Sequence, residues 1–116
     1  MYDGKETILP SYLVGYRASI ESIERVEKLN ITSILVPHYG VLGREETRFF
    51  LDNMKAAAER TAGELLDGLK NGLKDEEIIE RFKEKYWHGY IKETYPEDAL
   101  HLNTSIMINL IKNELL

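Results

Sequence analysis

The order of apolar and polar residues divides the chain into a strand-and-helix region followed by a long helical region. Residues 7–9 are predicted to form a short edge strand that stops at Pro10, because proline cannot donate to a ladder. A helix with Ser11 as its N-cap is expected to run to about residue 29, since its apolar positions recur every three or four residues. The β-branched run 31–36 predicts a second strand. Strand, helix and strand in this order favour a parallel pair covered by the helix.

The pattern after residue 44 predicts successive helices. The first is expected over about residues 45–73, either unbroken or broken near Gly68 or Gly72, with a stripe of apolar and small side chains. Asn71-Gly72 is the expected carboxyl-terminal cap, because glycine adopts the left-handed conformation that ends many helices. Asp75 then predicts the start of a shorter helix.

The last predicted helix begins with a capping box, in which Thr94 is the N-cap and Glu97 follows three residues later. It runs close to the end of the chain and carries two adjacent rows of apolar side chains. The rows are Leu102, Ile106 and Leu110, and Met107, Ile111 and Leu115. A face this broad is buried between two neighbouring helices or forms part of a subunit interface.

These patterns predict an α+β protein that is mainly helical, with about four helices packed on a short two-stranded parallel sheet. Residues 1–44 are expected to form the βαβ part, and residues 45–116 a helical tail. Because 116 residues suit one small domain, both parts are expected in one compact unit.

Composition and charge exclude several classes of function. The chain has no cysteine, which excludes disulfides and thiolate metal sites. Its net charge is −5, and the whole excess lies in residues 45–116, so no nucleic-acid partner is expected. The amino terminus lacks the apolar core of a signal peptide, and no stretch is apolar enough to span a bilayer. We therefore expect a cytoplasmic location and no membrane partner.

The stretch from Val36 to Gly40 contains the candidate site residues. His38 and Tyr39 follow a predicted buried strand, which fixes the backbone while the side chains reach a cleft. An ordinary polar turn residue is the alternative interpretation of His38. His88 is expected to lie near helix-terminal carbonyl groups and His101 to pack among leucines. The three histidines lack the spacing of a helical metal site, and no nucleophile-elbow or phosphate-loop motif occurs.

A helix, a strand ending in Val36-Pro37-His38-Tyr39-Gly40, and a long amphipathic helix from Glu45 resemble the carboxyl-terminal half of metallo-β-lactamase-fold hydrolases of the glyoxalase II-like kind. The resemblance covers roughly residues 5–116. In that superfamily the strand ends in a Pro-Gly-His-Gly-like turn, whose histidine binds the second metal ion. The resemblance implies that His38 is a metal ligand and that Tyr39 lines the substrate mouth. Aligned without a gap, however, Tyr39 falls on the ligand position and His38 on the glycine. Either the turn differs by one residue and His38 still reaches the metal, or that ligand is lost, so the alignment leaves open which of the two residues occupies the position.

The resemblance also implies that the chain is the carboxyl-terminal fragment of a larger hydrolase. The H-x-H-x-D-H motif, the next histidine and the bridging aspartate supply most of the family's metal ligands, and this chain lacks them. The parent protein would use zinc or another divalent metal to activate water against an ester, thioester or lactam. Zinc needs three or four protein ligands, so no metal is expected in this chain alone.

The fragment is expected to be inactive by itself and to expose a sheet edge where the rest of the fold belongs. Its expected partner is a second copy of the chain or the missing amino-terminal half, either of which would cover that edge. The alternative function is that of a stand-alone helical dimerisation or interaction module without catalysis.

Overall fold

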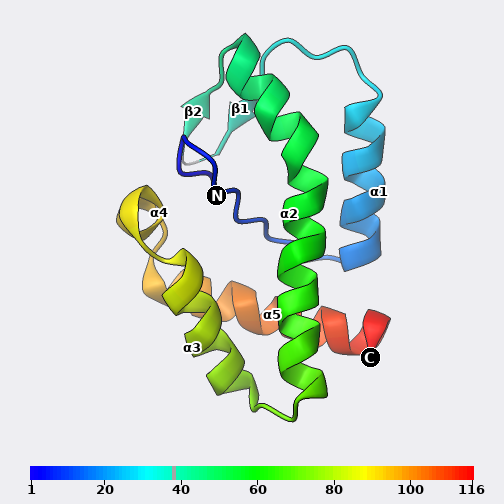
Figure 1. Cartoon of the computed structure of the whole chain (residues 1–116), viewed down its shortest axis with the longest axis vertical. Helices are drawn as coiled ribbons and strands as arrows, with labels where there is room; N and C mark the ends of the chain where they lie inside the picture. The colour runs from blue at the N-terminus through cyan, green and yellow to red at the C-terminus, as the bar shows by residue number, and fades with distance from the viewer. Residues whose placement is uncertain (38) are drawn as a thin grey trace.

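The computed structural model describes residues 1–37 and 39–116, and most of them are helical (Figure 1). In chain order the elements are α1 (Tyr16–Glu27), β1 (Leu35–Val36), β2 (Gly40–Val41), α2 (Arg44–Lys70), α3 (Asp75–Tyr86), α4 (Gly89–Thr94) and α5 (Glu97–Leu115). The mainly helical class is confirmed, but the described residues form five helices rather than about four. The additional helix is the short α4, which begins at Gly89 with φ of 58°.

The small sheet is antiparallel, so the predicted parallel pair is wrong. β1 and β2 form a hairpin, with Leu35 opposite Val41 and Val36 opposite Gly40. The backbone N–H of Tyr39 donates to the Val36 carbonyl at 3.1 Å and closes the turn. Pairing between neighbouring segments closes only a short loop, whereas a parallel pair needs a long crossover connection.

The amino-terminal segment does not join this sheet. Ile8, at the centre of the expected edge strand, instead forms an isolated antiparallel bridge with Tyr2. The backbone folds back because the Asp3 carboxylate accepts hydrogen bonds from the N–H groups of the next turn, those of Lys5, Glu6 and Thr7. A local side-chain turn therefore replaces the predicted strand.

The first helix starts at Tyr16, four residues later than an N-cap at Ser11 predicts, and its amino-terminal end is capped by a residue distant in the chain. Gly15 precedes it and has no side chain to act as a cap. Glu114 of α5 takes that role: its Oε2 accepts a hydrogen bond from the Tyr16 N–H at 2.8 Å, and its Oε1 accepts one from the Arg17 N–H at 2.9 Å. These two bonds hold the pKa of the Glu114 carboxyl below its ordinary value.

The long helix α2 ends as predicted. Gly72 adopts φ of 78°, and its N–H donates to the Leu69 carbonyl at 3.1 Å. The Leu73 N–H donates to the Gly68 carbonyl at 3.0 Å, which completes a Schellman motif. The helix passes through Gly68 without a break.

Two predicted helix starts are displaced. Asp75 is the first residue of α3 rather than its N-cap, a position that Lys74 occupies. The predicted capping box at Thr94 is wrong, because Thr94 ends α4 and its hydroxyl donates back to the Tyr90 carbonyl at 3.0 Å. Pro96 then precedes the first residue of α5.

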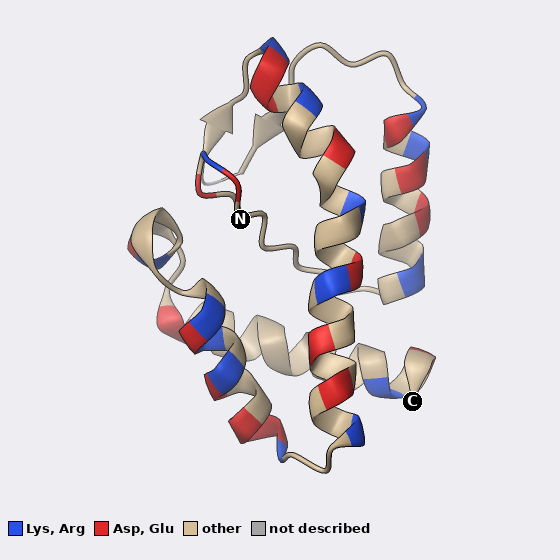
Figure 2. Ribbon diagram, viewed as in Figure 1, with Lys and Arg blue, Asp and Glu red and all other residues tan. Residues whose placement is uncertain are grey.

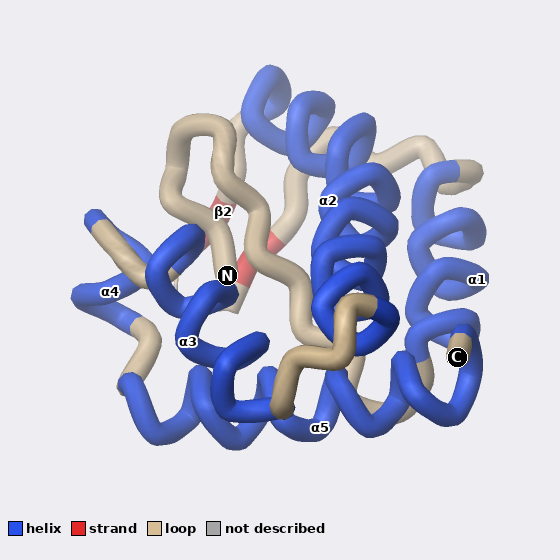
Figure 3. The backbone as a smooth tube through the Cα atoms, turned by 60° about the horizontal axis from the view of Figure 1, so that its bottom comes forward, coloured by secondary structure: helices blue, strands red, loops and turns tan. Residues whose placement is uncertain are grey.

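The main core lies where α5 crosses α2 and α3 (Figures 1 and 3). α5 supplies Leu100, Thr104, Met107, Ile108 and Ile111 to it as buried residues. The broad apolar face of α5 is therefore largely covered within the chain, by α1, α2 and α3. Leu102, which was predicted to belong to that face, is 60% exposed.

A second, smaller core fixes the hairpin. It consists of buried Tyr2, Ile8, Val36, Leu42 and Ala57. Only the inner face of the hairpin takes part in this core, since Leu35 and Val41 are each 71% exposed.

Basic and acidic residues are interspersed along α1, α2 and α3 (Figure 2). Among the residues that the structure describes, no helix combines the length and the apolar character needed to cross a membrane.

Candidate functional site

The candidate residue that the structure describes, Tyr39, lies in the turn of the hairpin. His38 lies outside the described residues, so its role as a metal ligand stays a prediction. Tyr39 is half-buried and lies against two other tyrosines. Its ring meets Tyr2 edge-on with 5.1 Å between the ring centroids, and it meets Tyr90 in the same manner at 5.8 Å. Tyr39 thus joins the hairpin to the amino-terminal segment and to α4.

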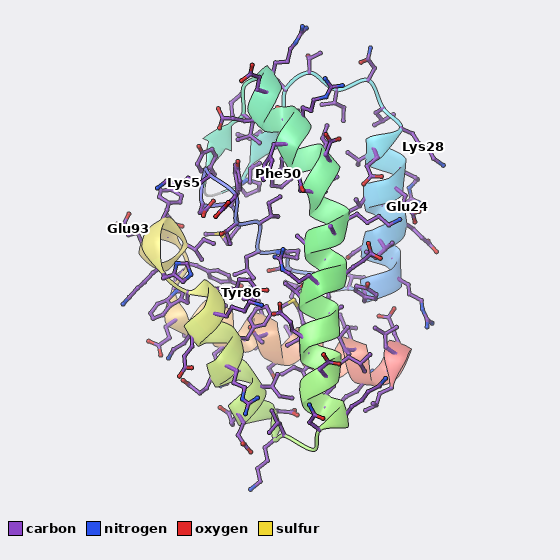
Figure 4. All side chains as sticks on the ribbon, in the orientation of Figure 1. Lys5, Glu24, Lys28, Phe50, Tyr86 and Glu93 are labelled. Atoms are coloured by element: carbon purple, nitrogen blue, oxygen red, sulfur yellow. The ribbon has the colours of Figure 1, made fainter. Side chains whose placement is uncertain are left out.

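The amino-terminal turn holds Tyr2 in position against Tyr39. Gly4 has φ of 80°, a conformation that favours glycine. A Cβ atom at this position would lie 2.7 Å from the Tyr39 ring, so glycine also permits the close approach of the two segments. Phe50 of α2 packs edge-on against Tyr2, with 5.5 Å between the centroids, and lies between α2 and the amino-terminal segment (Figure 4).

Besides desolvation, Glu46, a carboxylate in the first turn of α2, raises the pKa of both Tyr39 and Tyr2. The Tyr39 hydroxyl donates a hydrogen bond to Glu46 Oε2 at 3.4 Å. Desolvation and the nearby Glu46 carboxylate raise the pKa of Tyr39, and the same two causes raise the pKa of Tyr2. Both phenols are therefore neutral near pH 7. The Tyr39 hydroxyl is one hydrogen-bond donor, which can point to Glu46 or to a bound ligand.

The residues described do not form a metal site by themselves. Within residues 1–37 and 39–116, no group of three histidine, aspartate or glutamate side chains is placed to hold an ion. His88 Nε2 lies 2.9 Å from the Lys85 carbonyl oxygen, which confirms its expected place near helix-terminal carbonyls. The expected packing of His101 is wrong, because its ring is exposed and lies 3.0 Å from Glu76 Oε2 of α3.

A polar network around Tyr86 was not evident from the sequence. Tyr86 was expected to face inward on α3 and is buried, as expected. Its hydroxyl accepts a hydrogen bond from Arg60 Nε at 3.1 Å and donates to Glu64 Oε1 at 2.7 Å. Arg60 also donates to the Ile8 carbonyl at 3.2 Å. Burial and the Glu64 carboxylate raise the pKa of Tyr86, which remains a neutral link between α3, α2 and the amino-terminal segment (Figure 4).

The neighbours of Tyr39 were also missed by sequence reasoning. Tyr2 and Tyr90 are far from it in the chain, and Glu46 belongs to a helix whose polar face looks ordinary. No local pattern brings these residues together, since their meeting depends on the hairpin and on the amino-terminal turn.

Comparison with protein-family models, with curated proteins and with solved structures finds no match to this chain. The function must therefore be argued from the residues themselves.

Proposed function

We propose that this chain is the carboxyl-terminal portion of a metal-dependent hydrolase of the metallo-β-lactamase fold. In this proposal His38 is a ligand of the second metal ion, and Tyr39 lines the entrance to the substrate site. The remaining ligands belong to the amino-terminal portion of the hydrolase, because the described residues lack a ligand set of their own.

The observation that carries the proposal is the exposed outer face of the β1–β2 hairpin. Leu35 and Val41 are cross-strand partners, and each is 71% exposed, while the inner face packs on the second core. Each strand is also paired on one side only among the described residues. An apolar face with open edges, on the hairpin whose turn contains Tyr39, is where the rest of a larger sheet would pack.

Two measurements test this proposal. Sequencing the coding region in front of residue 1 is expected to reveal an in-frame segment with the H-x-H-x-D-H motif. Metal analysis of the purified 116-residue chain is expected to find well under one zinc per chain, because His38 alone cannot hold the ion. Stoichiometric zinc in this chain, or an upstream region without the motif, would contradict the proposal.

The longer protein permits a sharper test. His38→Ala is expected to lower its bound metal from two ions to about one, whereas His88→Ala leaves the metal content unchanged. Tyr39→Phe separates the two possible alignments, since it lowers metal content only if Tyr39 occupies the ligand position.

The alternative function, a helical interaction module, is favoured by the broad face of the last helix and by the lack of a complete catalytic site. Most of that face is covered by α1, α2 and α3, so its width does not require a partner. The outer face of the hairpin remains the surface that a partner of either kind would cover.

A further inference from the structure

A cavity of about 580 Å³ lies between the hairpin, the amino-terminal segment and the first turns of α5. Figure 3 shows α5 running beneath these segments, with α2 on one side. The residues that line it include Ser11, Val36, Pro37, Phe50, Ala99 and Asn103. This volume is within the range of small-molecule binding sites.

The walls carry no charged side chain among the described residues, although 30% of the chain is charged. Met1 also lines the cavity; its amino group donates to the Leu9 carbonyl at 2.7 Å, and burial lowers the pKa of that amino group. A charged ligand would lose its hydration here without gaining a side chain of opposite charge. The cavity therefore favours a neutral molecule.

Asn103 and Ser11 have hydrogen-bonding capacity to spare in the cavity. Asn103 donates from Nδ2 to the Tyr95 hydroxyl at 2.7 Å, and its amide oxygen receives no hydrogen bond from the described residues. The hydroxyl of Ser11 makes no hydrogen bond to the part of the chain that the structure describes. An acceptor on α5 and a hydroxyl on the amino-terminal segment can thus orient a ligand with one polar group.

We propose that this cavity binds a neutral molecule that consists mainly of an aliphatic chain or an aromatic ring and carries one hydroxyl or amide group. The apolar part lies against Val36, Pro37 and Phe50, and the polar group bonds to Asn103 or Ser11. Because Pro37 leads into the turn with Tyr39, the cavity would hold the apolar side of the substrate of the hydrolase. That assignment rests on the proposed function, whereas the binding itself does not.

Binding is tested on the 116-residue chain with the neutral fluorescent probe N-phenyl-1-naphthylamine. We expect saturable enhancement of its fluorescence at one probe per chain. 1-Decanol should displace the probe at a roughly tenfold lower concentration than the decylammonium ion, since no acidic side chain of the described residues lines the cavity. Absence of saturation, or equal displacement by the two competitors, would overturn the proposal.

Variants locate the bound probe. Ala99→Leu fills the cavity from α5 and Ser11→Leu fills it from the amino-terminal segment, so each is expected to weaken binding roughly tenfold. Ala56→Leu, on the exposed face of α2, is the matched control and should leave affinity unchanged. Circular dichroism verifies that each variant folds. If Ala99→Leu does not fold, the affinity of Ser11→Leu for the probe tests the location of binding.

The outer face of the hairpin is the competing location for the probe. Leu35→Thr should leave the affinity unchanged. Loss of binding in Leu35→Thr, together with unchanged binding in Ala99→Leu and Ser11→Leu, would overturn the proposal. Stoichiometric zinc in the 116-residue chain, or an upstream coding region without the H-x-H-x-D-H motif, would contradict the proposed function alone and would leave this binding result intact.

Discussion

The hydroxyl group of Tyr86 connects three parts of the chain through hydrogen bonds to Arg60 and Glu64. Tyr86→Phe removes this single oxygen and leaves both partners with one hydrogen bond fewer in a partly buried place. We expect the free energy of unfolding to fall by about 1–2 kcal/mol. Urea denaturation followed by circular dichroism measures the change.

Tyr16→Phe is the matched control for this prediction. Tyr16 is half-buried in α1, and its hydroxyl forms no hydrogen bond within the described residues. Its removal should change the free energy of unfolding by less than about 0.5 kcal/mol. Equal losses in the two variants would show that the Tyr86 network contributes no stability of its own.

Single residues differ in how far the sequence predicts their surroundings. The inward-facing residues of α3, namely Ile78, Ile79, Phe82 and Tyr86, are buried as the helical period predicts. Helical geometry is local, so spacing alone identifies them. Tyr39 is different, because its ring contacts and its hydrogen bond to Glu46 come from segments whose approach depends on the whole fold.

Among the elements, α2 contains two glycines that should respond to alanine in opposite ways. A Cβ atom at Gly63 would meet no other atom within 4 Å, whereas one at Gly68 would lie 2.9 Å from Ile78 Cγ1. Gly63→Ala should therefore stabilise the protein by about 0.5–1 kcal/mol through helix propensity. Gly68→Ala should destabilise it by about 1–3 kcal/mol, because α2 and α3 would be pushed apart.

Thermal and urea unfolding of the two variants measure these changes. Stabilisation by Gly68→Ala equal to that by Gly63→Ala would show that α3 moves away from α2 without cost, and it would contradict the close packing of the two helices.

The cap between α5 and α1 predicts a pH-dependent contribution to stability. The pKa of Glu114 is lowered in the folded protein from its ordinary value of 4.5, by hydrogen bonds from the Arg17 and Tyr16 N–H groups. A carboxyl group with a lowered pKa stabilises the fold fully above its unfolded-state pKa. It loses that effect as the pH falls through the folded-state pKa. Glu114→Gln should therefore lower the free energy of unfolding by about 1 kcal/mol at pH 7.

Urea denaturation of the two proteins across the pH range tests this sign. The difference between wild type and Glu114→Gln should shrink as the pH falls below 4.5. Glu84→Gln is the control, since Glu84 is exposed on α3 and has no ion pair or hydrogen bond within the described residues. A difference for Glu114→Gln that stays constant with pH would contradict the cap.

The elements themselves were predictable to different degrees. The end of α2 follows from Asn71-Gly72, because the Schellman motif is made by adjacent residues. The start of α1 does not follow from Ser11, because the capping carboxylate comes from the other end of the chain. The predicted strand pairing was wrong because the apolar pattern identifies an extended segment but does not specify its partner strand.

At the scale of the whole molecule, the exposed pair Leu35 and Val41 predicts self-association of the 116-residue chain. Light scattering at increasing concentration should show a rising average mass. Leu35→Thr combined with Val41→Thr should keep the chain monomeric, since threonine preserves strand propensity and reduces the apolar surface. A wild-type chain that is monomeric throughout would contradict this role of the hairpin face.

The division into residues 1–44 and 45–116 stays a prediction, although the main core draws on both parts. Leu9 and Tyr12 are buried together with residues of α2, α3 and α5. The Tyr12 hydroxyl also lies 3.2 Å from Thr61 Oγ1 of α2. These long-range contacts are not visible in periodicity, which explains why the helical class was predicted more accurately than the arrangement.

The Glu114 cap also has a consequence for the order of events during synthesis. α1 has no fully buried residue, and its first two N–H groups receive their acceptor from a residue 97 or 98 positions further along the chain. On the ribosome, α1 emerges long before that acceptor exists, so its first turn stays frayed while the middle of the chain is translated. Amide hydrogens of residues 16 and 17 should therefore become protected from exchange only after residue 114 has left the exit tunnel.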